Sequence, residues 1–348
     1  MTGFLDLLLK DEALEALIGT DADVTAMISV ELALAKATFA CGLIGENAAR
    51  EIATVGHGFK PDLARLNEAT LKDGVVVPEL VRQLKARVGA PHDGSVHFGA
   101  TSQDIIDTAL AVRLCAVFEL FDSRLKALLT SLDHLSASFG DNPLMGRTRM
   151  QAAIPIKVSD RIAVWRGLIE RMHVALGDVR SHNLIVSLAG PAGTSEKFGD
   201  KIGEVRHAMA ALLHLSMPDY VPHAARDRIA ALGNWLSQVT GALGKIGQDI
   251  ALMAQNEFAE ISLSGTGGSS AMTHKQNPVR AEVLVALARY NAVQVSGLHQ
   301  ALVHEQERSG SGWTLEWMIL PGMLNATGTA LIHAEALLGS VRRIGSAG

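Results

Sequence analysis

The chain has 348 residues, of which 48% are hydrophobic and only 4% aromatic, and its formal net charge is −5. This composition supplies a large core built mainly from aliphatic side chains. The acidic balance argues against a nucleic-acid-binding protein, which needs a basic face. No apolar run reaches the roughly 18 residues that a membrane-spanning helix requires, so we expect no membrane partner.

The cysteines and the first residues of the sequence indicate the cellular compartment of the protein. Cys41 and Cys115 stand in apolar, helix-like surroundings, which predicts two buried thiols rather than a disulfide or a metal site. The opening MTGFLDLLLKDEALEAL lacks the basic region and the cleavage site of a signal peptide. We therefore expect a cytoplasmic protein.

The first hundred residues differ from the rest of the chain. Helix-like stretches at 21–41 and 47–55 lead into the segments GHGFKPD and DGVVVP, which carry glycine and proline punctuation. We interpret residues 1–92 as a smaller N-terminal helical domain. Strand signals are few, and the best of them is the short VVV run at 75–77.

From residue 93 onward the pattern is that of long helices. Apolar residues alternate steps of four and three at Leu114, Phe118, Phe121, Leu125, Leu128, Leu132 and Leu135, and similarly from Leu232 to Met253. This spacing predicts an all-α fold in which residues 93–345 form a central bundle with helices over 104–139, 155–182, 227–258, 278–307 and 317–344. Helices of this length have second apolar stripes, which predict packing against further copies in a homo-oligomer.

Three polar islands interrupt the apolar helical sequence, and the first is HFGATSQDIIDT at 97–108. Thr101 or Ser102 can cap the helix that follows, with Asp104 in its first turn. Free helix N–H groups and two hydroxyls at one place suit a carboxylate ligand. The alternative is an ordinary helix cap with no ligand.

The second island is GRTRMQAAIP at 146–155, just before a predicted long helix. It crowds four polar residues into a short space, and Arg147 can hold a carboxylate through two parallel hydrogen bonds. The alternative is a solvated turn. Its polar residues are Arg147, Thr148, Arg149 and Gln151.

The third island is GTGGSSAMTHKQNP at 265–278. Its glycines make a flexible loop, Asn277 can cap the next helix, and Pro278 suits the first helical position. Between these ends lie Ser269, Ser270, Thr273, His274, Lys275 and Gln276. We interpret the segment as a catalytic loop, although linkers also use glycine and serine.

Other functional motifs fail on detail. A phosphate-binding loop needs GxxxxGK followed by Ser or Thr, but Gln276 follows Lys275 and no strand precedes the segment. HEQER at 304–308 begins like a zinc-protease motif, but its fifth residue is Arg308 rather than histidine. The thirteen histidines show no metal-ligand spacing, so we expect no metal.

With these islands in this order on a helical body, the whole chain resembles the fumarase/aspartase superfamily of lyases. The third island is similar to its signature GSSxMPxKxNP, here GSSAMTHKQNP. The first island resembles the superfamily's TS-containing region and the second its GRTHxQ region. The match at Gly268, Ser269, Ser270, Met272, Lys275, Asn277 and Pro278 is specific.

Within that group the chain most resembles the bacterial 3-carboxy-cis,cis-muconate cycloisomerases. The stretches DADVTAMISVELALAKATFACGLI, DGVVVPELVRQL and HEQERSGSGWTLEW are similar to segments of that family. The pair Trp313 and Trp317 differs from the lyases that release fumarate from succinyl compounds. The resemblance implies an enzyme without metal or organic cofactor, working as a tetramer whose sites each draw on three subunits.

Three departures from the superfamily pattern bear on function. Thr273 replaces the loop's usual proline, which loosens the loop. Arg149 replaces the histidine that serves fumarases and adenylosuccinate lyases, and an always-charged guanidinium is a poor general acid or base. We expect the superfamily's small C-terminal domain to be absent or reduced to a remnant, which leaves open any substrate or lid contact from it.

The resemblance implies a division of roles among the polar residues. Ser269 would transfer the proton and Lys275 would support its charge, with His97 as a third catalytic candidate. An acidic protein that binds a tricarboxylate needs a local set of cations and donors. For substrate binding the candidates are Thr101, Ser102, Arg147, Thr148, Gln151, Arg226, Asn277 and Arg308.

The expected reaction interconverts 3-carboxy-cis,cis-muconate and 4-carboxymuconolactone in protocatechuate (β-ketoadipate) catabolism. The alternatives are a sulfomuconate cycloisomerase, a lyase acting on adenylosuccinate or argininosuccinate, and a non-catalytic protein on the same scaffold. Arg149 and the Trp313 segment disfavour the lyases. The intact set of Ser269, Lys275 and Asn277 disfavours the scaffold.

Overall fold

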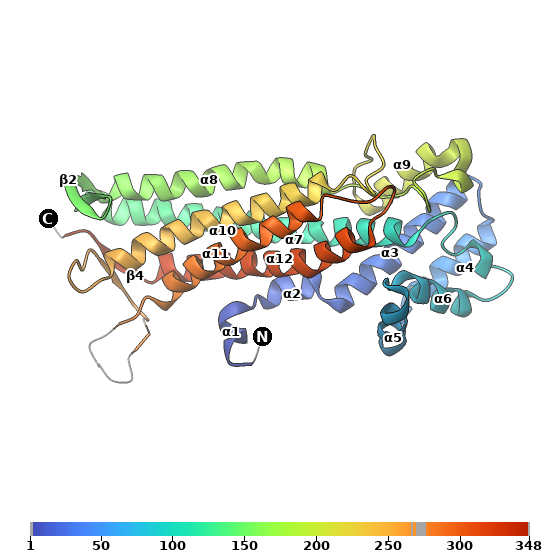
Figure 1. Ribbon diagram of the computed structural model, residues 1–348, viewed down its shortest axis with the longest axis horizontal. Coiled ribbons are helices and arrows are strands. Elements are labelled where there is room, and N and C mark those ends of the chain that lie inside the picture. The colour runs from blue at the N-terminus through green and yellow to red at the C-terminus, as the bar shows by residue number, and fades with distance from the viewer. Residues whose placement is uncertain (1–2, 266, 269–275, 347–348) are drawn as a thin grey trace.

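The computed structural model describes residues 3–265, 267–268 and 276–346. Five long helices lie alongside one another and give the molecule its elongated shape (Figure 1). They are α7 (Ser102–Phe139), α8 (Val158–Asn183), α10 (Asp227–Met253), α11 (Val279–Gln300) and α12 (Gly310–Gly339). The expected all-α bundle is confirmed.

The apolar spacing read from the sequence forms the core of this bundle. In α7 every residue of the four-and-three series from Leu114 to Leu135 is buried. Two buried tryptophans also satisfy their ring N–H groups, as apolar burial requires. Trp165 donates to Asp249 Oδ2 at 2.8 Å, and Trp235 donates to the carbonyl of Met172 at 3.0 Å.

Two glycines let α10 and α11 approach closely. A Cβ atom on Gly244 would lie 2.6 Å from the Cβ of Ala288, and one on Gly247 would lie 2.6 Å from the carbonyl oxygen of Ala281. Carbon atoms pack at roughly 3.5–4.0 Å, so neither position has room for a larger residue. These two helices therefore pack almost backbone to backbone.

Shorter helices flank one side and cover one end of the bundle (Figure 1). They are η1 (Gly3–Leu5), α1 (Asp6–Leu9), α2 (Glu12–Ile18), α3 (Thr20–Ala40), α4 (Glu46–Gly56), α5 (Leu63–Asp73), α6 (Val77–Val88), η2 (Asp93–Ser95), η3 (Glu196–Lys201) and α9 (Ile202–Leu213). A second core joins α3, α4 and α6 to the start of α7 and to residues 184–215. The division at residue 92 stays a prediction, since this core uses both sides of it.

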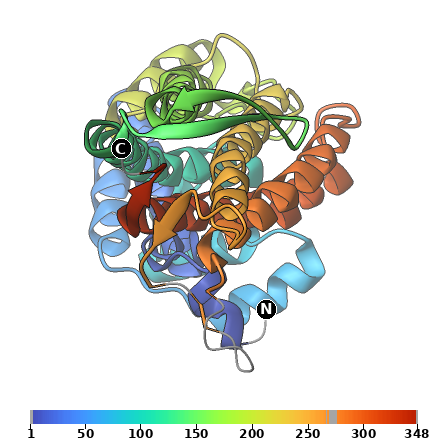
Figure 2. The same cartoon turned by 90° about the vertical axis from the view of Figure 1, so that its left-hand side faces the viewer.

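Two small antiparallel sheets lie at the opposite end of the bundle (Figure 2). One pairs β1 (Pro143–Thr148) with β2 (Gln151–Lys157), and the other pairs β3 (Ile261–Leu263) with β4 (Val341–Ile344). The β1–β2 hairpin turns on Arg149 and Met150, both with positive φ, as a two-residue type I′ turn requires. The second polar island therefore contains the turn of a β-hairpin, and its tip residues Thr148, Arg149 and Gln151 are exposed to solvent, as the alternative of a solvated turn expects.

Several sequence-based boundaries were wrong. The VVV run at 75–77 forms no strand, because Val77 begins α6 with Pro78 in its first turn. The helix expected over 278–307 ends at Gln300, and the next begins at Gly310 after Ser309 caps it by accepting from the N–H of Gly312 at 2.9 Å. Asn277 does not serve as the cap of α11, which begins at Val279 with Pro278 at the cap position.

Within the described ranges, no helix is both long and apolar enough to cross a membrane. The same ranges contain no group of three or more histidine, cysteine or acidic side chains placed to hold a metal ion.

Candidate active site

The predicted site residues fall at opposite ends of the bundle (Figure 1). His97, Thr101 and Ser102 stand at the start of α7, close to Arg226 at the start of α10 and Arg308 just before α12. Arg147, Thr148, Gln151 and Asn277 lie at the far end, beyond the end of α7. Since α7 has 38 residues, the two groups are separated by about 57 Å. Ser269 and Lys275 lie outside the described residues.

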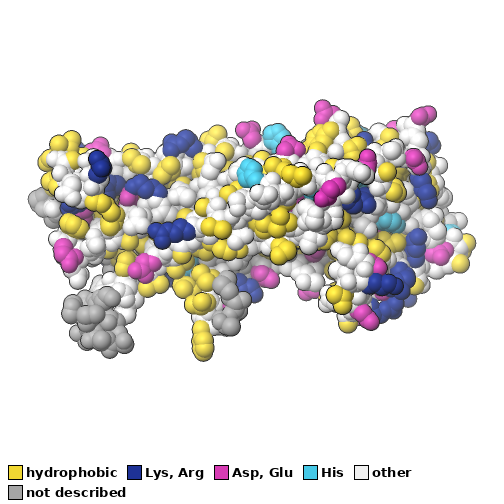
Figure 3. All heavy atoms as spheres, in the orientation of Figure 1, with side chains coloured by type: hydrophobic (Ala, Val, Ile, Leu, Met, Phe, Trp, Pro, Cys, Tyr) yellow, Lys and Arg dark blue, Asp and Glu magenta, His cyan; other side chains and the backbone are white. Residues whose placement is uncertain are grey.

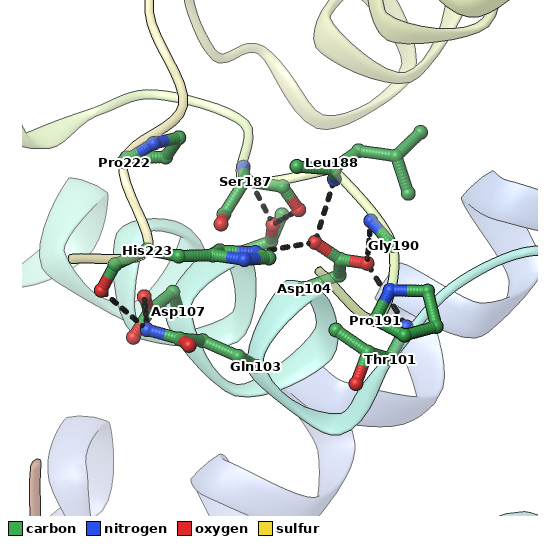
Figure 4. A network of polar contacts seen from close by, with 12 residues as sticks. Thr101, Gln103, Asp104, Asp107, Ser187, Leu188, Gly190, Pro191, Pro222 and His223 are labelled. Atoms are coloured by element: carbon green, nitrogen blue, oxygen red, sulfur yellow. Dashed lines mark hydrogen bonds and ion pairs between the residues drawn. The ribbon is translucent and has the colours of Figure 1, made fainter. Parts of the chain in front are cut away.

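Asp104 is the organising residue at the start of α7 (Figure 4). Its buried carboxylate accepts backbone N–H bonds from Thr101 at 2.9 Å, Ala189 at 2.8 Å and Gly190 at 3.0 Å. It also contacts Nε2 of buried His223 at 2.7 Å. One carboxylate therefore ties two distant segments of the chain, at Ala189–Gly190 and at His223, to the helix cap, with charge-assisted bonds that are stronger than neutral ones.

Gln103 connects this cluster to Arg308. Its buried side-chain nitrogen donates to the carbonyl of His223 at 2.8 Å and to Asp107 at 3.3 Å, which fixes the orientation of the amide. The amide oxygen then accepts from Nε of Arg308 at 2.8 Å. Arg308 also donates from Nη2 to the carbonyl of Pro191 at 3.1 Å. The guanidinium is thus held beside the cap while it remains partly exposed.

Arg226 is the centre of a buried ion-pair network. It donates to Glu316 at 2.8 and 2.5 Å, to Asp107 at 2.5 and 3.3 Å, and to the carbonyl of Pro222 at 3.4 Å. Burial alone would lower the pKa of Arg226, but the two carboxylates outweigh it and the pKa is raised. All five guanidinium donors are engaged, so in this arrangement Arg226 joins α7 to α12 rather than offering a donor to a ligand.

The pKa of Asp107 reflects the same network. Burial acts to raise it, but Arg226 and the neighbouring Arg228 hold it below its ordinary value. Arg228 is itself buried, 3.7 Å from Asp107, and burial lowers its pKa. Mutual neutralisation of this kind is what allows several charges to be buried together.

A pocket of about 320 Å³ opens beside this network. Asp107, Arg226 and Glu316 supply polar groups, and the remaining lining is mostly apolar, including Val75, Val76 and Leu110, with Trp317 from α12. Trp317 packs against Trp313 with ring centroids 4.5 Å apart and ring planes tilted by 51°. The DGVVVP segment and the tryptophan pair, distant in sequence, therefore meet at this end of the bundle.

The hairpin end presents a different arrangement. Arg147 pairs with Glu260 at 2.8 Å and lies over the ring of Phe258, 4.2 Å from its centroid. Thr148 and Gln151 face each other across the hairpin turn, and both are exposed. Arg149, at the turn, is also exposed. Exposed polar groups at the tip of a rigid hairpin are suited to contact another molecule.

Sequence reasoning missed the residues that hold the first island in place. Asp104 was interpreted only as a first-turn acid, and Gln103, Asp107 and His223 were not singled out. Glu316 was noted only as part of the segment HEQERSGSGWTLEW. The signal for two of them was present, because Asp104 and Asp107 lie three residues apart in an otherwise apolar helix. His223 carries no local signal, and the segment around Glu316 does not indicate its pairing with Arg226, since the partners of these two residues lie 119 and 90 residues away.

The fold and the site residues point to one class of protein, and comparison with known proteins identifies the family. The family model described as "Lyase" matches residues 17–297, and the chain belongs to this family. The 3-carboxy-cis,cis-muconate cycloisomerase of Pseudomonas putida is 34% identical over 317 residues, which cover 89% of this chain and 75% of that protein.

Solved structures and other relatives extend the comparison. The 3-carboxy-cis,cis-muconate lactonizing enzyme from Pseudomonas putida superposes with a TM-score of 0.92 at 30% identity, covering 98% of this chain and 77% of that one. Trans-aconitate decarboxylase 1 from Mycosarcoma maydis is 30% identical over 90% of this chain and 64% of its own length. The family therefore includes relatives with different named reactions.

Proposed function

We propose that this protein is an intramolecular lyase that interconverts 3-carboxy-cis,cis-muconate and 4-carboxymuconolactone, a step of protocatechuate catabolism. The observation that carries the proposal is the similarity to the cycloisomerase of Pseudomonas putida across 89% of the chain. The polar cluster at the start of α7 supports it, because Thr101, Ser102 and Arg308 offer donors for a carboxylate at one place.

The chemistry sets clear demands on the site. One substrate carboxylate oxygen forms a bond to a carbon of the diene, and the neighbouring carbon takes a proton. The reverse step is a β-elimination, in which the carboxylate leaves as the proton is removed next to another carboxylate. That step develops extra negative charge, so preorganised donors should contribute the largest part of the rate acceleration.

The roles of the loop residues rest on the sequence motif. We assign proton transfer to Ser269, with Lys275 lowering the pKa of its hydroxyl through a nearby positive charge. Asn277 and the N–H groups of the loop would bind the developing charge. Closure of this loop over the substrate would exclude water.

The placement of the site residues supports a shared active site. Thr101 and Arg308 lie about 57 Å from the hairpin that carries Arg147, which is too far for one small substrate. We infer that a complete site combines this end of one copy with the far end of another. Hydrophobic side chains are exposed along the bundle (Figure 3). Tyr290, Val293 and Met318 are among the exposed hydrophobic residues, and such exposure favours packing between copies. We propose a homo-oligomer, with four subunits as the resemblance implies.

The reaction is tested by absorbance and by product analysis. We expect the diene absorbance of 3-carboxy-cis,cis-muconate to fall when the purified protein is added, with the lactone identified by NMR. The panel should include the sulfonated muconate, trans-aconitate, adenylosuccinate and argininosuccinate. Turnover of one of these instead would replace the proposed substrate, and inertness toward all of them would favour a non-catalytic protein.

The assignment of Ser269 has its own test. Ser269→Ala should retain the helical circular dichroism signal and lose most turnover. Ser296→Ala is the matched control, because Ser296 is an exposed residue of α11 whose hydroxyl bonds only locally, to the carbonyl of Val293 at 2.9 Å. Near-normal turnover in Ser269→Ala would exclude a proton-transfer role for that serine.

A further inference from the structure

His97 is held by a buried carboxylate from a distant helix. Its Nδ1 lies 2.6 Å from Oε1 of Glu31, which belongs to α3. The His97 side chain is 17% exposed and the Glu31 side chain 1% exposed. Because Nδ1 is engaged by the carboxylate, the ring has only Nε2 left for a ligand.

The burial of Glu31 requires an explanation. A glutamate is almost never fully buried without a partner, because desolvating a carboxylate is costly. Among the described residues His97 is the hydrogen-bond partner of Glu31 Oε1, and Oε2 has none. A carboxylate in this position is stabilised most by a positively charged imidazole.

The backbone around His97 is also constrained. His97 has φ of 61°, in the left-handed region that few non-glycine residues adopt. Two residues later, Gly99 has φ of 71°, and a Cβ there would lie 2.7 Å from the ring of Phe198. Such strained conformations persist only where the surroundings hold them, and they cluster at functional sites.

The charged groups around His97 come from three helices. Burial by itself would lower the pKa of His97, and Lys85 from α6 acts in the same direction. Glu31 from α3, by its charge and its hydrogen bond, and Asp104 from α7 act in the opposite direction and prevail, so the pKa of His97 is raised. The positive form is therefore favoured at a higher pH than for an ordinary histidine.

We propose that Glu31 is a positioning residue that holds the His97 ring through Nδ1 and favours its positively charged form, which leaves Nε2–H to bind a carboxylate of the substrate. The ligand class is a di- or tricarboxylate, and the proposal rests on the proposed function for the identity of that ligand. His97 then supplies a cation beside Thr101, at the end of the bundle where all donors of Arg226 are already engaged by carboxylates and carbonyls.

The first experiment measures the charge of His97 directly in the intact protein. Protein labelled with ¹³C at histidine is titrated by NMR, and His97→Gln assigns the signal. We expect His97 to titrate above its ordinary value of about 6.5 and to shift downward in Glu31→Gln. A wild-type His97 that titrates at or below the ordinary value overturns the proposal, and this measurement does not depend on whether the variant folds.

The second experiment separates charge from simple packing. If Glu31 acts through the charge of His97, Glu31→Gln should raise KM by about threefold near pH 7, and the difference should largely disappear near pH 5.5, where an ordinary histidine is protonated without help. A defect of equal size at both pH values indicates a structural role and overturns the proposal.

The Asp122–His173 pair provides a matched control. His173 Nε2 lies 2.8 Å from Asp122 Oδ1 on the middle of α7 and α8, far from the cap that carries Thr101. Asp122→Asn removes the carboxylate of a histidine pair in the same way but should leave KM unchanged at both pH values. An equal KM change in this variant would show that the effect is not specific to His97.

Calorimetry with tricarballylate, an inert tricarboxylate probe, separates this proposal from the proposed reaction. Weaker tricarballylate binding in Glu31→Gln at high pH, restored at low pH, supports the inference even if the protein does not turn over 3-carboxy-cis,cis-muconate. Unchanged binding together with a shifted His97 titration overturns the carboxylate-binding role.

Discussion

The side-chain oxygen of Gln103 accepts a hydrogen bond from Nε of Arg308 at 2.8 Å, joining the first turn of α7 to the segment that precedes α12. Because the amide nitrogen of Gln103 is committed to His223 and Asp107, the oxygen can only face Arg308. The buried amide of Gln103 therefore fixes the orientation of the partly exposed Arg308 guanidinium.

Replacing Gln103 should therefore affect substrate binding without removing a charge. Gln103→Met keeps the size of the side chain but frees Arg308, and a hydrogen bond to a charged group contributes roughly 1.5–3 kcal/mol. We expect KM to rise by about tenfold or more, with kcat changed less. Steady-state kinetics would check this, and a KM equal to that of wild type would show that Arg308 is positioned by other contacts.

Asp104 is expected to be the most sensitive residue of the cap. Asp104→Asn removes the charge and keeps only one of the two oxygens that accept backbone N–H bonds, because the amide nitrogen that replaces the other oxygen cannot accept. The loss should reach about 3 kcal/mol, in the range for breaking a buried charged network. Thermal unfolding would measure it. Asp133→Asn, which breaks an exposed pair with Arg166, should change stability by less than about 1 kcal/mol.

The Arg226 network gives a pH prediction whose sign follows from Asp107. The pKa of Asp107 is lower in the folded protein than its ordinary value, despite the opposing effect of burial. The carboxylate therefore contributes stability that is present above the ordinary pKa of about 3.9. That stability is lost as the pH falls through the lower, folded-state pKa.

The variant Asp107→Asn tests this sign. Its unfolding temperature should lie well below that of wild type at neutral pH, because Arg226 and Arg228 lose a buried partner. The difference should narrow as the pH is lowered below about 4, because there the unfolded wild-type chain takes up a proton at Asp107 that the folded protein does not yet bind. A difference that stays constant with pH would mean that packing, rather than charge, explains the loss.

The sequence predicted the bundle well because its signal is local and repeated. Every residue of the series from Leu114 to Leu135 is buried as expected. The β1–β2 hairpin was not predicted, because its turn uses Arg149 and Met150 at positive φ instead of the Asn-Gly or Asp-Gly pairs that announce such turns. The side chains of Arg149 and Met150 therefore do not predict the backbone conformation of this turn.

The candidate site was predictable only in part, for a related reason. Polar residues clustered in the sequence identified Thr101, Ser102 and Arg308, but their supports come from elsewhere in the chain. Glu31 lies 66 residues from His97, and Glu316 lies 90 residues from Arg226. Nothing in a single sequence reports such a pairing, because it depends on how α3, α7, α10 and α12 pack together.

The separation of the site residues leads to a prediction about mixed oligomers. If one site combines the Arg308 end of one subunit with the loop of another, two inactive variants can complement each other. Ser269→Ala and Arg308→Met should each lose most activity when pure. After co-expression, or after dissociation and reassembly together, random assortment should leave about a quarter of the sites with both wild-type parts.

The measurement is the specific activity of the mixed oligomer, with each pure variant carried through the same procedure as its control. Recovery of about a quarter of wild-type activity supports shared sites, since neither variant alone contains a complete set of residues. A subunit that formed its whole site from its own residues could show no recovery. Because Thr101 and the β1–β2 hairpin lie at opposite ends of α7, we expect the mixed oligomer to be active.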